Sequence, residues 1–149
     1  MASAARVVVL ALLGLVPAVY AAPDAERTVE QVRFPAGSGA TVIKGSVKGY
    51  RYVDYQVRAG AGQRLKVSMQ AGSRASYFNV LPPESQDAAM FIEGAADKAF
   101  DGVLPDDGIY TVRVYLMRSA ARRNETSNFT LSVAIEGKPL LEAEAVLHR

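Results

Sequence analysis

Three arginines, Arg118, Arg122 and Arg123, lie close together between two strand-like stretches in the sequence RVYLMRSAARRNETSNFTLSV (113–133). Residues 108–124 contain no aspartate or glutamate. The planar guanidinium group of arginine can grip a carboxylate with two parallel hydrogen bonds, so repeated arginine favours recognition of an acidic partner. In a helical turn, Arg118 and Arg122 would share one face at spacing i, i+4. A loop that charge merely keeps soluble is the alternative interpretation.

The sequence lacks the residues that hydrolytic and zinc-dependent chemistry requires. Its one histidine, His148, lies beside the C-terminus, and the chain contains no cysteine. A serine or cysteine nucleophile needs a positioned base, and a zinc site needs several histidine or cysteine ligands. Asp106 and Asp107 are adjacent acids, but their position before Gly108 is typical of a turn. We therefore expect a protein that is not an enzyme, with no metal site and no cofactor.

A cluster of aromatic and basic residues raises the question of nucleic-acid binding, because such side chains can stack on bases and contact phosphates. Asp54 interrupts this cluster, and the whole chain carries a formal charge of only +2. We therefore expect no nucleic-acid partner, and the single histidine further disfavours an enzyme acting on nucleic acid. The cluster consists of Lys48, Tyr50, Arg51, Tyr52 and Tyr55.

Residues 1–21 have the pattern of a secretory signal peptide, with Arg6, an apolar run at 7–16 and small residues before a cleavage site after Ala21. The apolar run is too short to cross a bilayer of about 30 Å as a permanent helix. A chain without cysteine also suits an oxidising compartment. We expect a periplasmic protein whose mature form starts at Ala22 and does not insert into the membrane.

Alternation of apolar and polar residues predicts the fold class. From Val42 to Ile135 the period is two, with turn residues between the runs, as in short antiparallel strands. The pattern favours an all-β protein with a single antiparallel, jelly-roll-like β-sandwich of about eight strands. The expected organisation is a flexible N-terminus at 22–30, a sandwich domain at 31–137 with a first strand at 31–34, and a C-terminal tail at 138–149.

The two most regular runs, 110–116 and 129–135, predict the last hairpin. Their apolar residues alternate strictly, so we expect the two runs to pair in the centre of one sheet. Their connection at 117–126 carries the arginines and is long for a hairpin loop, and long loops in compact domains are commonly functional or disordered. The residues expected in the core are Val112, Val114, Leu116, Phe129, Leu131 and Val133.

Three stretches of the chain resemble the periplasmic inhibitors of g-type lysozyme. They are KGYRYVDYQVRAGAGQRLKVSM (48–69), YFNVLPP (77–83) and GIYTVRVYLMRSAARRNETSNFTLSVAI (108–135). The resemblance is strongest in the KGY motif and in the loop pattern R-x-x-A-R-x-N. It implies a β-sandwich that docks on a g-type lysozyme and blocks the enzyme's sugar-binding cleft.

The resemblance also implies a site. In that family, a surface patch formed by the KGY tyrosine and two loop arginines carries the inhibition, which here corresponds to Tyr50, Arg118 and Arg122. Asn124 completes the loop pattern, and Arg123 lies one step off the shared helical face, so we expect it to contribute less. A wider similarity to secreted pre-peptidase C-terminal-type β-sandwich modules leaves a non-catalytic binding module for another envelope component as the alternative. An exposed sheet edge would also allow a homodimer.

Overall fold

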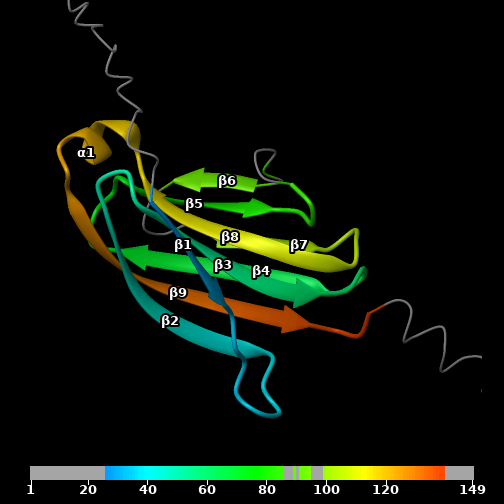
Figure 1. The fold of residues 1–149 in the computed structure, drawn as a ribbon. Helices are drawn as coiled ribbons and strands as arrows, with labels where there is room; N and C mark the ends of the chain where they lie inside the picture. Colours follow the sequence, from blue (N-terminus) through cyan, green and yellow to red (C-terminus); the bar gives the residue numbers. More distant parts are fainter. Residues whose placement is uncertain (1–25, 86–88, 90, 95–98, 140–149) are drawn as a thin grey trace, which may run out of the picture.

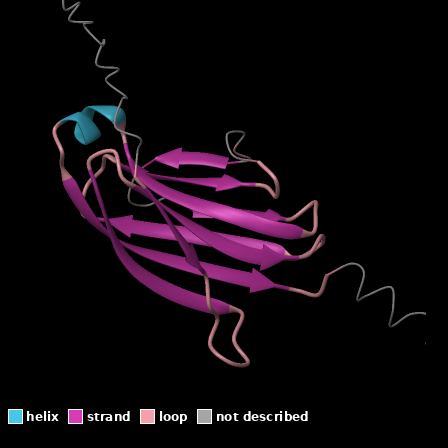
Figure 2. Ribbon diagram, viewed as in Figure 1, coloured by secondary structure: helices cyan, strands magenta, loops and turns pink. Residues whose placement is uncertain are grey.

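The computed structural model describes residues 26–85, 89, 91–94 and 99–139 (Figure 1). Within these residues lie nine strands and one short helix (Figure 2). In chain order the elements are β1 (Arg27–Gln31), β2 (Ala40–Lys48), β3 (Tyr52–Ala59), β4 (Arg64–Ala71), β5 (Ser76–Leu81), β6 (Phe91–Gly94), β7 (Ala99–Val103), β8 (Gly108–Leu116), α1 (Arg118–Arg122) and β9 (Thr126–Glu136).

The strands form two sheets that pack face to face (Figure 1). One sheet has the order β1-β3-β8-β5-β6, and the other has the order β2-β9-β4-β7. Neighbouring strands are antiparallel, with the exception of β1, which runs parallel to β3. The all-β sandwich expected from the sequence is confirmed, with nine strands among the described residues.

The core lies between the two sheets and follows from the alternation within the strands. Successive residues of a strand point to opposite faces, so every second side chain of β8 and β9 turns inward. The ring of Tyr55 on β3 meets that of Phe129 on β9 edge-on, with 6.2 Å between ring centroids. All the residues expected in the core are buried, as predicted: Val112, Val114, Leu116, Phe129, Leu131 and Val133.

The predicted pairing of the last two strands is wrong. β8 pairs with β3 and β5 in one sheet, whereas β9 pairs with β2 and β4 in the other. The segment at 117–126 therefore crosses between the sheets and is not the loop of a hairpin. Strict alternation marks a strand with one buried face. Because β8 and β9 are inner strands of facing sheets, their alternation is the same as that of two paired strands.

The first strand begins earlier than expected. β1 pairs in parallel with β3, so Arg27 belongs to the sheet although the sequence predicted a flexible N-terminus at 22–30. The strand predicted at 31–34 shares only Gln31 with β1. An ion pair between distant residues fixes this strand, since Arg27 Nε lies 2.7 Å from Asp54 Oδ2. The alternation of apolar and polar residues along the chain does not reveal a contact between residues so far apart in the sequence.

Some predicted features fall outside the described residues: the secretory signal at 1–21, His148 and nearly all of the tail at 138–149. Within the part of the chain that the structure describes, no helix is long and apolar enough to cross a membrane.

Candidate functional site

Two crossings between the sheets lie side by side at one end of the sandwich (Figure 1). The turn between β2 and β3 makes one crossing and carries the KGY motif, and the segment containing α1 makes the other between β8 and β9. They are neighbours because β2 pairs with β9 in one sheet while β3 pairs with β8 in the other. The topology thus brings together two motifs that lie far apart in the chain.

The KGY turn holds Tyr50 at the surface. The backbone N–H of Arg51 donates to the carbonyl oxygen of Lys48 at 3.1 Å and closes the turn, in which Gly49 has a φ of +59°. The N–H of Gly49 donates to the carbonyl oxygen of Glu125 at 2.9 Å and ties the turn to the segment that follows α1. Tyr50 is 49% exposed. A large aromatic side chain therefore projects from a fixed backbone.

The helix α1 turns small side chains inward and arginines outward. Ala120 and Ala121 are buried, and their short side chains let the helical turn pack closely on the sandwich. Arg118 and Arg122 are exposed at the two ends of the turn. The segment thus contains the helical turn in which, from the sequence, Arg118 and Arg122 would have spacing i, i+4. Met117, directly before the helix, is 39% exposed and adds an apolar contact surface.

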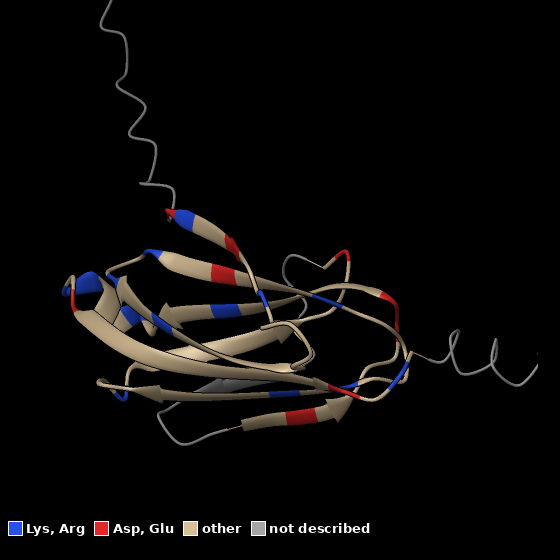
Figure 3. Ribbon diagram, turned by 90° about the horizontal axis from the view of Figure 1, so that it is seen from below, with Lys and Arg blue, Asp and Glu red and all other residues tan. Residues whose placement is uncertain are grey.

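The charge of this segment is partly balanced, which corrects the expectation that no acid compensates it. Arg123 Nε lies 2.6 Å from Glu125 Oε1, and this acid follows directly after the acid-free stretch. Among the described residues, no ion pair of Arg118 or Arg122 is found. Figure 3 shows basic positions gathered around α1 at this end of the molecule. Two of the three arginines therefore face solvent with their charge uncompensated by a described neighbour.

Asn124 links the helix to the turn. It has a φ of +53°, a conformation that asparagine adopts more readily than most residues. Its backbone N–H donates to the carbonyl oxygen of Ala121 at 2.9 Å. Its side-chain oxygen lies over Gly49, where an added Cβ atom would come within 2.7 Å of it. The structure therefore brings all the predicted site residues to one end of the sandwich: Tyr50, Arg118, Arg122, Arg123 and Asn124.

A groove beside these residues contains side chains that the sequence analysis did not assign to the site. Arg113 and Tyr115 are outward-facing residues of β8, so their alternation identifies them only as surface positions. They line the groove together with Tyr52 of β3, the strand that pairs with β8. The groove has a volume of about 560 Å³ and is lined by Gly49, Tyr50, Arg51, Tyr52, Asn79, Arg113, Tyr115, Leu116 and Arg118.

The carboxylate of Asp54 anchors the side chains of this groove. Asp54 is fully buried, although its position in β3 alternates with core residues and predicted an outward-facing polar side chain. Arg113 donates from Nε to Oδ1 at 2.7 Å and from Nη2 to Oδ2 at 3.0 Å, and Arg27 covers the carboxylate from β1. The guanidinium carbon of Arg113 lies 4.7 Å from the centre of the Tyr52 ring. The two arginines, rather than the core, exclude water from Asp54.

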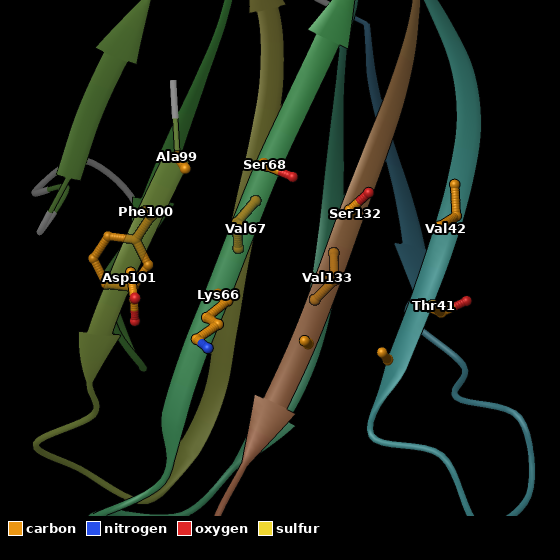
Figure 4. A pocket seen from close by; sticks show the side chains of 12 residues that line it. Thr41, Val42, Lys66, Val67, Ser68, Ala99, Phe100, Asp101, Ser132 and Val133 are labelled. Carbon is orange, nitrogen blue, oxygen red and sulfur yellow. The ribbon is translucent and has the colours of Figure 1, made fainter. Parts of the chain in front are cut away.

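A second hollow of about 480 Å³ lies on the other sheet, across β2, β9, β4 and β7 (Figure 4). Its charged lining residues are Lys66 and Asp101, and each is already paired. Lys66 Nζ lies 3.0 Å from Glu136 Oε1, and Asp101 Oδ1 lies 2.6 Å from Arg64 Nε. This hollow therefore offers no uncompensated charge comparable with that of Arg118, and we place the candidate site at the α1 end.

Asp106 and Asp107 have structural roles in a turn, as the sequence predicted. Asp107 Oδ1 accepts a hydrogen bond from the backbone N–H of Ala61 at 2.7 Å. The hydroxyl of Tyr110 donates to the carbonyl oxygen of Asp106 at 2.8 Å. Over the described ranges, no group of three or more His, Cys, Asp or Glu side chains is placed to hold a metal ion.

Comparison with known proteins finds relatives among lysozyme inhibitors. No protein-family model matches the chain. The inhibitor of g-type lysozyme from Escherichia coli strain K12 is 29% identical over 106 residues, which cover 70% of this chain and 79% of that protein. The crystal structure of Aeromonas hydrophila PliG, a periplasmic lysozyme inhibitor of g-type lysozyme, is 35% identical, with a TM-score of 0.70 over 74% of this chain and 98% of that chain. Salmonella Typhimurium PliG, at 23% identity, supports the fold with a TM-score of 0.58 over 73% of this chain and 98% of that chain.

Proposed function

Since the chain belongs to the family of periplasmic inhibitors of g-type lysozyme, we propose that it binds a g-type lysozyme in the periplasm and blocks the substrate cleft of that enzyme. The family relationship supports the partner. The periplasmic relatives and the signal-like sequence at 1–21 support the location. Blocking a cleft needs binding alone, so the proposed role involves no chemical step, no metal and no cofactor.

The proposed mode of binding rests on one observation: the KGY turn and α1 lie next to each other. Tyr50 and Arg118 line one groove although they belong to different crossings. Arg122 lies one helical turn from Arg118 and is exposed as well. One aromatic and two cationic side chains are therefore presented together on a protruding end of the sandwich.

These side chains suit the cleft of a glycosidase. Such a cleft contains an essential carboxylic acid, commonly with a second one nearby, and is shaped for a chain of sugars. Arg118 and Arg122 would pair with carboxylates inside the cleft, and Tyr50 would supply a rigid anchor with large contact area. Buried arginine and tyrosine contacts dominate the energetics of many interfaces, and removing one partner of a desolvated charge pair costs about 2 kcal/mol or more.

The fixed backbone at this end favours tight binding. The N–H of Gly49 bonds to Glu125, and the N–H of Asn124 bonds to the carbonyl oxygen of Ala121. Segments that are ordered before binding lose less conformational entropy when the complex forms. The site is therefore preorganised in both crossings.

The test measures cell-wall lysis by purified g-type, c-type and i-type lysozymes while the mature protein is added at increasing concentration. We expect inhibition of the g-type enzyme, and we expect a soluble sugar oligomer that occupies the cleft to weaken binding of the protein to that enzyme in a direct binding assay. An Arg118→Ala/Arg122→Ala double variant serves as the matched control and should inhibit far less. Full activity of the g-type enzyme at saturating wild-type protein would contradict the proposal. Binding that the sugar oligomer does not weaken would place the contact outside the cleft.

A further inference from the structure

Met117 is an exposed methionine at the start of the helical turn α1. It occupies the N-cap position of this helix, directly before Arg118, and is 39% exposed to solvent. Met69 is the other methionine among the described residues, and it is 1% exposed in the core between the sheets. The described part of the chain therefore contains one methionine that solvent reaches and one that the core encloses.

The backbone of Met117 is held at both of its polar groups. Its N–H donates to the carbonyl oxygen of Ala75 at 2.8 Å, and its carbonyl oxygen accepts a hydrogen bond of 2.9 Å from the N–H of Ala121. The first bond ties the start of α1 to the turn between β4 and β5, and the second closes the helical turn. The exposed thioether therefore belongs to a position with a fixed backbone.

The position of Met117 places it within the proposed contact surface. Its two chain neighbours, Leu116 and Arg118, line the groove that also contains Tyr50. A methionine side chain is apolar and adaptable, and it adds contact area that needs no hydrogen-bond partner. Binding of lysozyme through Tyr50 and Arg118 would cover Met117 as well, because Met117 directly precedes Arg118.

A thioether that solvent reaches is open to oxidation by a peroxide. A lone pair of the sulfur attacks one oxygen of hydrogen peroxide, the O–O bond breaks, and the second oxygen leaves as water. The sulfur gains one oxygen atom and is oxidised by two electrons to the sulfoxide. Methionine sulfoxide is polar, and methionine sulfoxide reductases return it to the thioether. The change is therefore reversible.

We propose that Met117 is an oxidation site that controls inhibition: peroxide converts its thioether to the sulfoxide and weakens lysozyme binding, and a reductase restores it. The effect on binding rests on the proposed function, whereas oxidation of Met117 can be measured without the enzyme. A sulfoxide oxygen carried into the contact would lose its water, and burial of a polar group without a partner is unfavourable. We expect oxidation to raise the inhibition constant about tenfold.

The first measurement follows the two methionines by mass spectrometry while the mature protein is exposed to hydrogen peroxide. Met117 should oxidise much faster than Met69, because the core closes off the sulfur of Met69. A saturating amount of g-type lysozyme should slow oxidation of Met117 and leave the rate of Met69 unchanged. Equal rates for the two methionines, or an unchanged rate of Met117 in the complex, would overturn the inference.

The second measurement compares the inhibition by each protein before and after peroxide. Met117→Leu removes the thioether and should show little change on treatment, whereas Met69→Leu is the matched control and should respond as the wild type does. Reductase treatment should restore inhibition by the oxidised wild type. If the oxidised wild type inhibits fully while Arg118→Ala does not, the inference is overturned and the proposed function stands. Equal peroxide sensitivity of Met117→Leu and the wild type would also overturn it. If the untreated wild type inhibits no g-type lysozyme, both are overturned.

Discussion

The backbone N–H of Gly49 donates a hydrogen bond of 2.9 Å to the carbonyl oxygen of Glu125, which joins the KGY turn to the end of the arginine segment. This bond extends the β2–β9 pairing one step beyond Lys48 and Thr126. This hydrogen bond links the two crossings between the sheets. The conformation of Gly49 therefore contributes, together with the strand pairing, to the relative placement of Tyr50 and the loop arginines.

Gly49→Ala should disturb this placement. An alanine at a φ of +59° costs about 1 to 2 kcal/mol of folding free energy, and its Cβ atom would displace the Asn124 side chain. We expect the variant to fold with that loss of stability and to lose about 1 kcal/mol or more of binding free energy for lysozyme. Urea unfolding and an inhibition assay measure the two effects.

Gly37→Ala is the matched control for this prediction. Gly37 has a φ of +72°, and an added Cβ atom would meet nothing within 4 Å. It should lose a similar amount of stability through the backbone alone and retain full inhibition. Equal loss of inhibition in both variants would show that lower stability, rather than the position of the turn, accounts for the effect of Gly49→Ala.

The buried carboxylate of Asp54 should be a large contributor to stability. Asp54→Ala would leave Arg27 and Arg113 without their shared partner, and removing one member of a buried ion pair costs about 3 to 5 kcal/mol. We expect the lower end of this range, because the Arg27 side chain is 37% exposed. Asp101→Ala removes an exposed pair with Arg64 and should lower the denaturation midpoint far less than Asp54→Ala does. Similar denaturation midpoints for the two variants would contradict the role of Asp54.

Alternation along the strands was sufficient to predict which residues fill the core. Val112 and Leu131 are buried as expected, because a period of two assigns every second side chain to the same face of its strand. Alternation does not say which strand lies beside which. The pairing of β8 with β3 and β5 depends on contacts across the whole domain, so the predicted hairpin with β9 was wrong.

In the candidate site, too, the features set by neighbouring residues were predictable from the sequence, whereas contacts between distant strands were not. The helical turn and the outward arginines follow from spacing within α1, and the small residues Ala120 and Ala121 mark its buried face. The pairing of Arg123 with Glu125 was not predicted, because Glu125 lies just beyond the acid-free residues 108–124. Asp54 was missed for a different reason: its two partners lie on β1 and β8, and only the folded sheet brings them over its carboxylate.

Stability should fall in strongly alkaline solution through Tyr55. Burial, with a smaller effect of the Glu30 charge, raises the pKa of this phenol to about 12 from its ordinary value of 10.0. The unfolded chain releases the proton first, so this contribution is complete below pH 10 and is lost as the pH rises toward about 12. A shift of this size corresponds to at most about 3 kcal/mol. In urea unfolding between pH 9 and about 11.5, Tyr55→Phe should lose less stability than the wild type; identical slopes would contradict the assignment.

Substitution of the loop arginines distinguishes recognition of a partner from a role in keeping the segment soluble. If Arg118 and Arg122 pair with carboxylates in a lysozyme cleft, replacing either with alanine should weaken inhibition by about 2 kcal/mol or more, while folding stability stays within about half a kcal/mol. Arg123→Ala is the matched control from the same segment and should lose less, because this arginine already pairs with Glu125. Lysine at Arg118 or Arg122 should restore only part of the inhibition, since an ammonium keeps the charge but not the two-bond geometry. Inhibition constants and denaturation midpoints of the five variants decide the question. Three alanine variants that inhibit as well as the wild type would show that these arginines only solvate the segment.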